Sequence, residues 1–380
     1  MKILHIIPTL MTGGAERLVI DICNELEKIK DIEVKLLLLS DQIDFDKKKF
    51  SFDFSIIKSH LNLSITGSNQ VNLSEYENAV REFAPDIINS HLFEAELLSR
   101  WKIFPNITYI THCHDNMSQI NDFSRKKSFK KNITDYYEKQ ILYKKYKDCD
   151  NNFIAISKDT RRYFAKMLPK KLKKNIFLLS NAIDFEKFYV KERKKTSSNR
   201  KISIVSIGSL VKKKNQAFLV PIVMYLKTKG YDCKVDVLGD GPNRASLQKQ
   251  IDSCCLHKEI ILQGKVKNVK DFMQKAEFYV HTATYEPFGL VILEAMAAGL
   301  PVISLDGKGN RDIIEHTKNG FIFQNQSAEQ FGKTIIKLQK NTLLYKSIIE
   351  EGFNTAKKHD IINYTDKLVQ LYKQAILNKG

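Results

Sequence analysis

The chain has 380 residues, of which 43% are hydrophobic and 27% charged, the composition of an ordinary globular protein. One hydrophobic core rarely serves a chain of this length, so we expect two domains. The six cysteines form no C-x-x-C pair, which excludes a disulfide framework and a zinc site and indicates a reducing compartment. A net charge of +18 predicts anionic partners, namely nucleic acid, anionic lipid or a phosphorylated substrate, unless the lysines form a plain solvated surface.

Short apolar runs alternate with amphipathic stretches in the first half of the chain. Strands are expected at 3–7, 34–39, 87–91, 109–111, 153–156 and 176–179, and helices at 15–27 and 74–82. This alternation is typical of βαβ units and predicts an α/β fold with a doubly wound parallel sheet. Residues 1–8 are apolar but short and lack a cleavage pattern, so we interpret them as the first strand and not as a signal peptide. No apolar run reaches about eighteen residues, so no membrane-spanning helix is expected.

The polar stretch 190–201, VKERKKTSSNRK, has no apolar period and is interpreted as a linker between two domains, 1–190 and 201–360. Beyond it, strands are expected at 202–207, 234–238, 260–262, 278–281, 302–305 and 321–323, and helices at 216–228, 245–253, 269–275, 290–298, 328–340 and 343–357. A last helical segment, about 361–380, is expected to pack back on the first domain. Because ligands bind at the carboxyl ends of strands in such sheets, we expect an active site between two Rossmann-like domains.

The stretch 282–310 places Glu286 and Glu294 on either side of a predicted loop and helix start. Gly289 lets the backbone approach a ligand closely, and the first N–H groups of the helix suit a phosphate. Glu294 lies about one turn into the helix, roughly 6 Å along its axis. A nucleoside diphosphate sugar, with hydroxyl groups at both ends and phosphates between them, fits this layout. The alternative is a structural helix with one solvated and one capping glutamate.

In each predicted domain, a glycine-containing turn follows the first strand. Gly13-Gly14 precedes a helix and brings backbone N–H groups close to an anion or a sugar, or is simply a tight turn. It is not the G-x-G-x-x-G dinucleotide fingerprint. Gly208 opens a loop with three lysines, Lys212 to Lys214, any of which could neutralise a diphosphate if the loop is not merely solvated.

His112 and His114 flank Cys113 at the end of the strand predicted at 109–111. Alternate residues of an extended segment point the same way, so the two rings are expected on one side. The H-x-H pattern is compatible with a metal, but no third ligand occurs at a matching spacing. We therefore interpret a histidine here as a substrate contact, with a structural histidine as the alternative.

Basic and aromatic residues are interleaved between residues 123 and 174. The basic ones are Arg125 to Lys127, Lys130, Lys131, Lys144, Lys145 and those of 170–174, and the aromatic ones are Phe123, Phe129, Tyr136, Tyr137, Tyr143 and Tyr146. Such a face suits an anionic membrane surface. It could instead bind RNA, although no RNP-type or helix-turn-helix pattern accompanies it, or be a plain solvated surface.

Taken together, these motifs resemble the retaining glycosyltransferases of family 4 over nearly the whole chain. The resemblance is greatest at 264–320, where Glu286 and Glu294 match the family's E-x7-E motif. It implies the GT-B architecture, two Rossmann-like doubly wound domains facing across a cleft, with the acceptor on the first domain and the donor on the second.

The resemblance also implies residue roles. The implied catalytic residues are His114, Glu286 and Lys214, with His112 as the fallback for the histidine, and the implied donor-binding residues are Gly13, Gly14, Gly208, Lys214, Phe288, Gly289, Leu290 and Glu294. In this scheme Glu286 holds the sugar and Glu294 the ribose. The family often has an arginine where this chain has Ser209, so one contact with the diphosphate is missing, and Lys212 or Lys213 is the candidate substitute.

The implied reaction moves a hexosyl or N-acetylhexosaminyl group, with retention, from a UDP- or GDP-sugar to a hydroxyl group. The acceptor would be a glycan or a polyprenyl-diphosphate-linked glycan in capsule or O-antigen synthesis. No cofactor, metal or nucleic-acid partner is expected, and the location would be cytoplasmic, peripheral on the inner face of the plasma membrane. A sugar-nucleotide epimerase of the same fold is the enzymatic alternative, and a basic RNA-binding protein the non-enzymatic one. A nicotinamide oxidoreductase lacks its glycine fingerprint here.

Overall fold

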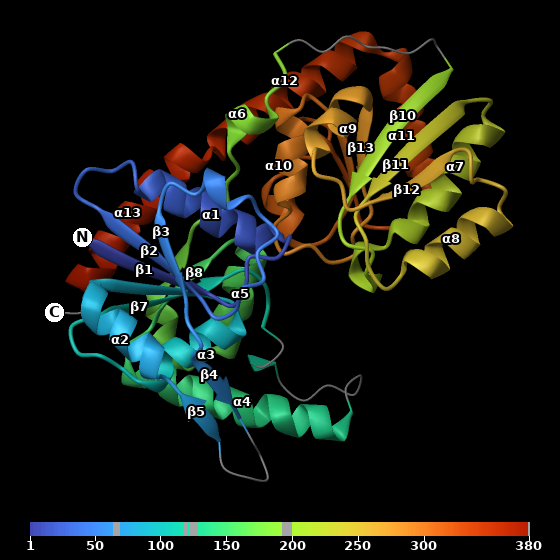
Figure 1. The fold of residues 1–380 in the computed structure, drawn as a ribbon. Helices are drawn as coiled ribbons and strands as arrows, with labels where there is room; N and C mark the ends of the chain where they lie inside the picture. Colours follow the sequence, from blue (N-terminus) through green and yellow to red (C-terminus); the bar gives the residue numbers. More distant parts are fainter. Residues whose placement is uncertain (64–68, 118–119, 122–127, 192–199, 379–380) are drawn as a thin grey trace. The chain divides into compact units, whose positions relative to one another are not determined.

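The computed structural model describes residues 1–63, 69–117, 120–121, 128–191 and 200–378. The chain divides into two compact units, of which the first is Met1–Asn181 with Ile361–Gly380 and the second is Ala182–Asp360 (Figure 1). The chain therefore enters the second unit once and returns to the first with its last helix. Each unit is described separately.

The first unit is built on a seven-stranded sheet in the order β3-β2-β1-β6-β7-β8-β9, all of whose neighbouring strands are parallel. The strands are β1 Lys2–Ile7, β2 Glu33–Leu38, β3 Asp53–Ile56, β6 Ile87–His91, β7 Thr108–Cys113, β8 Asn152–Ala155 and β9 Ile176–Leu178. A short antiparallel pair, β4 His60–Asn62 and β5 Gln70–Asn72, lies outside it. The central strands are buried along nearly their whole length, which explains their continuous apolar runs.

Six α-helices in the described part of the first unit accompany this sheet. They are α1 Gly14–Leu26, α2 Ser74–Phe83, α3 Phe93–Trp101, α4 Phe129–Asp148, α5 Lys158–Met167 and α13 Ile361–Leu377, and the 3-10 turns η1 Lys47–Lys49 and η3 Lys170–Asn175 are shorter. Helix α13 comes from the end of the chain yet contacts α1 from its beginning (Figure 1). A hydrogen bond also ties α13 to the sheet, because the buried Tyr372 hydroxyl accepts from Asn89 in β6 at 2.6 Å.

The second unit repeats the plan with a six-stranded parallel sheet in the order β12-β11-β10-β13-β14-β15. Its strands are β10 Lys201–Ile207, β11 Asp232–Leu238, β12 Ile260–Gly264, β13 Phe278–His281, β14 Val302–Leu305 and β15 Phe321–Phe323. Its α-helices are α6 Phe185–Phe188, α7 Leu219–Thr228, α8 Arg244–Ser253, α9 Val269–Lys275, α10 Leu290–Ala297, α11 Ala328–Lys340 and α12 Thr342–Lys358, and its 3-10 turns are η4 Lys212–Lys214, η5 Gln216–Phe218 and η6 Gly309–Asp312.

In both sheets the strand order reverses beside the first strand of the unit. In the first unit β1 lies between β2 and β6, and in the second β10 lies between β11 and β13. A doubly wound sheet binds its ligand at this switch point, outside the carboxyl ends of the strands. The segments that follow β1, β6, β10 and β13 are therefore the places to look for function.

The predicted linker lies later in the chain than the boundary between the units. The structure ends the first unit at Asn181, whereas the predicted first domain extends to residue 190. The reason is α6, whose buried Phe185 and Phe188 belong to a helix that contacts α10 of the second unit. Of the predicted linker 190–201, residues 192–199 lie outside the described part, and Lys201 begins β10.

Candidate functional site

Glu286 lies on the loop after β13, at the switch point of the second sheet. Its backbone N–H donates to the Gly307 carbonyl at 2.8 Å, and its own carbonyl accepts from the N–H of Gly309 at 3.0 Å. A Cβ at Gly307 would lie 2.7 Å from the Glu286 Cβ, and one at Gly309 would lie 1.9 Å from the Pro287 oxygen. Only glycine fits this close approach, so the segment after β14 fixes the backbone of Glu286.

The Glu286 carboxylate is buried and charged. Its Oε2 accepts a hydrogen bond from Lys214 and lies 3.1 Å from His281 Nε2. Burial by itself would raise the pKa of Glu286, but the Lys214 charge and the His281 contact outweigh it and lower the pKa to about 2. Glu286 is therefore an anion at neutral pH.

His281 bridges Glu286 to a second buried group. Its Nδ1 lies 2.9 Å from the hydroxyl of Tyr279, which is completely buried in β13. An ionised carboxylate only accepts hydrogen bonds, so the His281 tautomer with its proton on Nε2 is the one that suits Glu286. Nδ1 then accepts the Tyr279 hydroxyl proton. We call Lys214, Tyr279, His281 and Glu286 the glutamate cluster.

The loop that carries Lys214 is fixed against the same segment. The Lys214 carbonyl accepts from the Thr282 hydroxyl at 2.9 Å, and the Lys213 carbonyl accepts from the Thr284 N–H at 2.9 Å. Gly208 lies beneath the Lys214 side chain, because a Cβ there would lie 3.6 Å from the Lys214 Cδ. Lys213 Nζ is 5.8 Å from the Tyr285 ring centroid, so Lys213 also reaches this loop.

Helix α10 begins directly after Gly289 and carries Glu294. Gly289 has φ of 107°, a conformation that a residue with a Cβ rarely adopts. Phe288 and Glu294 are both buried, whereas Leu290 is half-buried. The helix has no side-chain N-cap, and Glu294 is not solvated, so the alternative of one capping and one solvated glutamate is wrong.

Gly13 and Gly14 mark the start of α1 in the first unit. Gly13 is the N-cap in extended backbone, and a Cβ there would lie 2.1 Å from a carboxylate oxygen of Glu16. The preceding loop is held by Asp44, whose Oδ2 accepts from the N–H and the hydroxyl of Thr12 at 2.8 and 2.9 Å. The turn is therefore a defined structure at the switch point of the first sheet.

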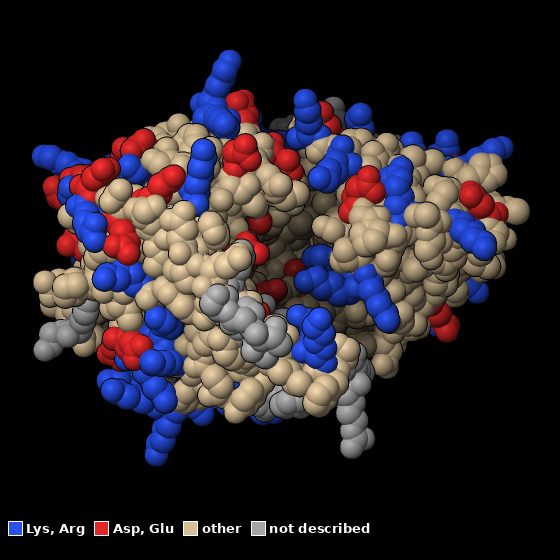
Figure 2. Space-filling view, turned by 60° about the horizontal axis from the view of Figure 1, so that its bottom comes forward, with Lys and Arg blue, Asp and Glu red and all other residues tan. Residues whose placement is uncertain are grey.

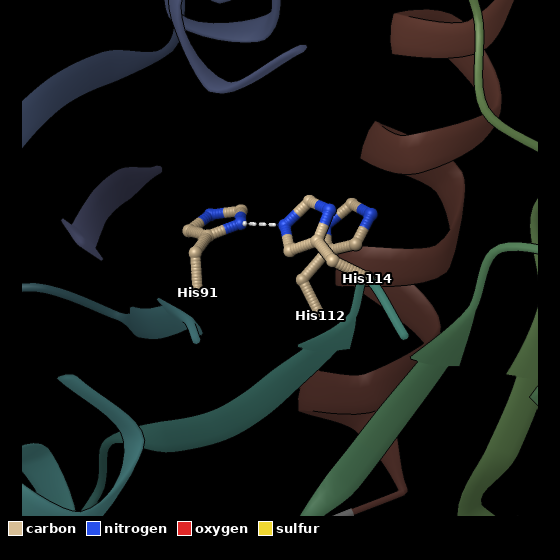
Figure 3. A group of neighbouring side chains, drawn as sticks. All are labelled: His91, His112 and His114. Carbon is tan, nitrogen blue, oxygen red and sulfur yellow. Dashed lines mark hydrogen bonds between the residues drawn. The ribbon is translucent and has the colours of Figure 1, made fainter. Parts of the chain in front are cut away.

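The histidines after β7 are joined by a third that the sequence spacing did not suggest. His112 and His114 stack at 4.6 Å with nearly parallel rings, as alternation in an extended segment predicts. His91, the last residue of β6, pairs in register with His112 of β7 and contacts both rings (Figure 3). Sequence spacing could not identify this third histidine, because strand pairing brings it from 21 residues away in the chain.

The basic stretch between residues 123 and 174 contains both surface and core residues. Phe123 and Arg125 to Lys127 lie outside the described residues. Phe129 and Tyr136 are exposed on α4, but Tyr146 is buried and donates to Glu96 at 2.6 Å. Lysine and arginine side chains are spread over the face shown in Figure 2, with acidic residues among them. No helix in the described ranges has the length and apolar character needed to cross a membrane.

Comparison with known proteins accounts for both units. Residues 12–187 match the family described as "Glycosyltransferase Family 4", and residues 189–355 match "Glycosyl transferases group 1". Over 402 aligned positions, covering 99% of this chain and 100% of the relative, the chain is 25% identical to the Staphylococcus aureus "Capsular polysaccharide biosynthesis glycosyltransferase CapH".

A second relative is the "N-acetylgalactosamine-N,N'-diacetylbacillosaminyl-diphospho-undecaprenol 4-alpha-N-acetylgalactosaminyltransferase" of Campylobacter jejuni. It is 30% identical over 174 residues, which are 45% of this chain and 47% of the relative. The chain spans half or less of the length of the first curated relatives that it matches.

A solved structure supports the fold over the whole chain. The crystal structure of Anabaena Alr3699/HepE in complex with UDP-glucose has a TM-score of 0.78 at 18% identity and covers 98% of this chain and 99% of its own. Two parallel-sheet α/β units and this likeness establish the GT-B fold. The chain belongs to family 4 of the glycosyltransferases, whose two halves the two family matches describe.

Proposed function

We propose that the protein transfers a sugar from a nucleotide-sugar donor to a hydroxyl group of a glycan acceptor, with retention of the anomeric configuration. The observation that carries this proposal is the pair of buried carboxylates, Glu286 and Glu294, on either side of the α10 N-terminus. Carboxylate oxygens accept hydrogen bonds, and sugar hydroxyl groups donate them. The backbone N–H groups at the start of α10 lie between the two and suit a phosphate.

Each residue then has a role at the donor. Glu294 binds the ribose hydroxyl groups, Glu286 binds the transferred sugar, and Gly289 with the Phe288 and Leu290 backbone receives the phosphate. The Lys214 ammonium moves from Glu286 to the diphosphate and neutralises part of its charge. Because Lys214 and Glu286 are already paired, each is held charged in position before the donor arrives.

The first unit would supply the acceptor side. Gly13 and Gly14 offer backbone N–H groups at the start of α1, and His114 offers a ring nitrogen near the carboxyl end of β7. The leaving diphosphate, stabilised by Lys214 and the helix N-terminus, accepts the proton of the attacking hydroxyl group. This scheme asks for no catalytic divalent ion, so transfer should continue in EDTA, and a strict requirement for added divalent ions would contradict it.

The donor role is tested first by calorimetry. A thermal-shift panel of UDP-, GDP- and other nucleotide sugars identifies the donor, and its affinity is then measured in Glu294→Ala. Loss of charged hydrogen bonds to ribose, each about 1.5–3 kcal/mol, should weaken binding on the order of tenfold to a hundredfold. The control is Glu315→Ala, which removes an exposed glutamate of the same unit paired with Lys318. An unchanged affinity in Glu294→Ala would remove Glu294 from the site.

Product analysis separates transfer from its enzymatic alternative. Incubation of donor without acceptor should leave the sugar unchanged, whereas an epimerase would convert it. With acceptor, the product should keep the donor's anomeric configuration, and an inverted product would rule out the retaining mechanism.

We further propose a polyprenyl-diphosphate-linked acceptor in surface polysaccharide synthesis and a peripheral location on the cytoplasmic side of the membrane. The relatives named above act in capsule synthesis and on a diphospho-undecaprenol-linked glycan, according to their names. Exposed Phe129 and Lys130 on α4 are candidate membrane contacts. Flotation with anionic vesicles at low salt should be weaker for Lys130→Glu than for Lys333→Glu, which makes the same change of charge in the second unit. Equal flotation would exclude α4 as the contact.

A further inference from the structure

Three histidines of the first unit form a hydrogen-bonded chain. His5 Nδ1 lies 2.8 Å from His91 Nε2, and His91 Nδ1 lies 2.8 Å from His114 Nε2. His5 comes from β1, His91 from the end of β6, and His114 directly follows β7, so the series crosses three neighbouring strands. His5 and His91 are completely buried, whereas His114 is partly exposed. We call these three residues the histidine chain.

The geometry favours hydrogen bonding over metal binding. Candidate ligand atoms of His91, His112 and His114 lie within 4.8 Å of one another. However, the His112 and His114 rings are stacked with only 5° between their planes (Figure 3). Imidazole lone pairs lie in the ring plane, so two parallel stacked rings do not converge on one ion. Both nitrogens of His91 are also engaged by other histidines.

The three rings are neutral at physiological pH. Burial lowers the pKa of His5 and of His114 to about 3, and that of His91 well below its usual value. With a pKa of about 3, roughly one ring in ten thousand is charged at pH 7. Each neutral imidazole has one nitrogen that donates and one that accepts.

Two hydrogen bonds in series through neutral rings allow only two proton arrangements. If His5 donates from Nδ1, then His91 accepts at Nε2, donates from Nδ1, and His114 accepts at Nε2 and carries its own proton on Nδ1. If the direction is reversed, all three rings carry the proton on Nε2. In both arrangements the three histidines have the same tautomer, so the proton position on buried His5 is tied to that on His114.

We propose that His5 and His91 are positioning residues, which act through this hydrogen-bonded chain to set whether Nδ1 of His114 donates to or accepts from the substrate. The part that concerns substrate rests on the proposed function, in which His114 contacts the reacting sugars. The hydrogen bonding within the histidine chain does not depend on that function. His5 is a poor place to store a proton, because a charge there would be buried with no partner on Nε2 among the described residues.

The test is the tautomer of each ring, read from long-range ¹H–¹⁵N correlations of the ¹⁵N-histidine-labelled full chain at pH 7 without ligand. Single histidine variants assign the signals. The wild-type protein should show one common tautomer for His5, His91 and His114. Any mixed set of tautomers among these three rings would overturn the proposal.

Variants then test the coupling. In His91→Phe the tautomers of His5 and His114 should no longer match each other, since the link between them is gone. The matched control is His112→Phe, which removes a ring that stacks on His114 but does not belong to the chain, and the common tautomer should persist. Loss of the common tautomer in the control alone would show that stacking sets it, and would overturn the proposal.

Zinc and kinetics complete the experiment. Zinc added to the metal-free protein should leave the three ring signals in place. Binding of one equivalent of zinc with shifts of the His91, His112 and His114 signals would show a metal site and overturn the proposal. His91→Phe should lower kcat on the order of a hundredfold, while the affinity for the nucleoside diphosphate of the donor identified in the thermal-shift panel stays unchanged. An unchanged kcat would overturn the positioning role. If no donor supports transfer in the wild-type protein, the proposed function fails, and the tautomer result is judged separately.

Discussion

Each unit places a buried histidine at the switch point of its sheet, but the two histidines have opposite surroundings. In the second unit, Nε2 of His281 faces the ionised Glu286, which can only accept a hydrogen bond and so favours the proton on Nε2, while Nδ1 faces the Tyr279 hydroxyl. In the first unit, both ring nitrogens of His91 lie within hydrogen-bond distance of other histidines, and each of these can donate or accept. The histidine tautomer is therefore set by a carboxylate in the second unit and depends on other histidines in the first.

This difference separates two ways to prepare a site. The glutamate cluster holds charge, because Lys214 compensates a buried carboxylate and the result is a fixed anion. The histidine chain avoids charge, because burial keeps every ring neutral and leaves only the positions of protons to be set. A lysine and a carboxylate that are held charged together suit a ligand with both phosphates and sugar hydroxyl groups, and neutral rings suit an uncharged hydroxyl group.

The largest effect is expected when the charge pair is broken. Lys214→Ala leaves Glu286 buried without its cation, which should lower the free energy of unfolding by about 3–5 kcal/mol. Chemical denaturation of wild-type and variant proteins measures the loss. The control is Lys227→Ala, which breaks the more exposed Lys227–Glu259 pair of the same unit and should cost under about 1 kcal/mol.

Glu286→Gln combined with Lys214→Ala should recover part of that stability, because the uncompensated charge is gone. If the double variant is as unstable as the sum of the two single variants, the pair is not coupled and the cluster is not an electrostatic unit.

The next largest effect is expected in acid, where the two units should lose stability over different pH ranges. The folded pKa of His5, about 3, lies below its unfolded value of 6.5, so its stabilisation is complete above pH 6.5 and is lost as pH falls toward 3. That loss is about 2 kcal/mol at pH 5. Glu286 has a folded pKa of about 2 against 4.5, so its contribution is lost only below about pH 4.5.

The first unit should therefore loosen before the second as pH falls from 7 to 4. Hydrogen exchange read by mass spectrometry, peptide by peptide, distinguishes the units. Loosening of the second unit first would contradict the contrast between a neutral chain and a charged cluster.

The smallest effect concerns the tautomer of His281. Tyr279→Phe removes one buried hydrogen bond and should cost about 1 kcal/mol of stability, with a slight loss of donor affinity through Glu286. Tyr345→Phe is the matched control, because its hydroxyl donates to the Glu277 carbonyl at 2.9 Å in the same unit. If donor affinity falls equally in both variants, the loss comes from lower stability of the unit and not from the His281 tautomer.

Much of the fold could be predicted from apolar period and turn residues. Apart from β3, the strands of both sheets and the helices after Gly13 and Gly289 were predicted within a few residues, because their buried runs are continuous. The edge strand β3 and the pair β4–β5 were missed, since their short segments mix polar and apolar residues. Helices α3, α4 and α5 were missed as well, and α4 in particular is highly charged with few buried residues.

By itself, the sequence determined the family and the local chemistry of the chain, because spacing within one segment is preserved in the folded state. Glu286, Gly289 and Glu294 are joined by a single loop and helix, so their arrangement could be inferred from their numbers alone. The tertiary structure decided which distant groups meet them. Parallel strands bring together residues that lie tens of positions apart, and no local pattern records which strands become neighbours. His5 and His91 therefore join His114, and Lys214 joins Glu286, only once the two sheets have formed.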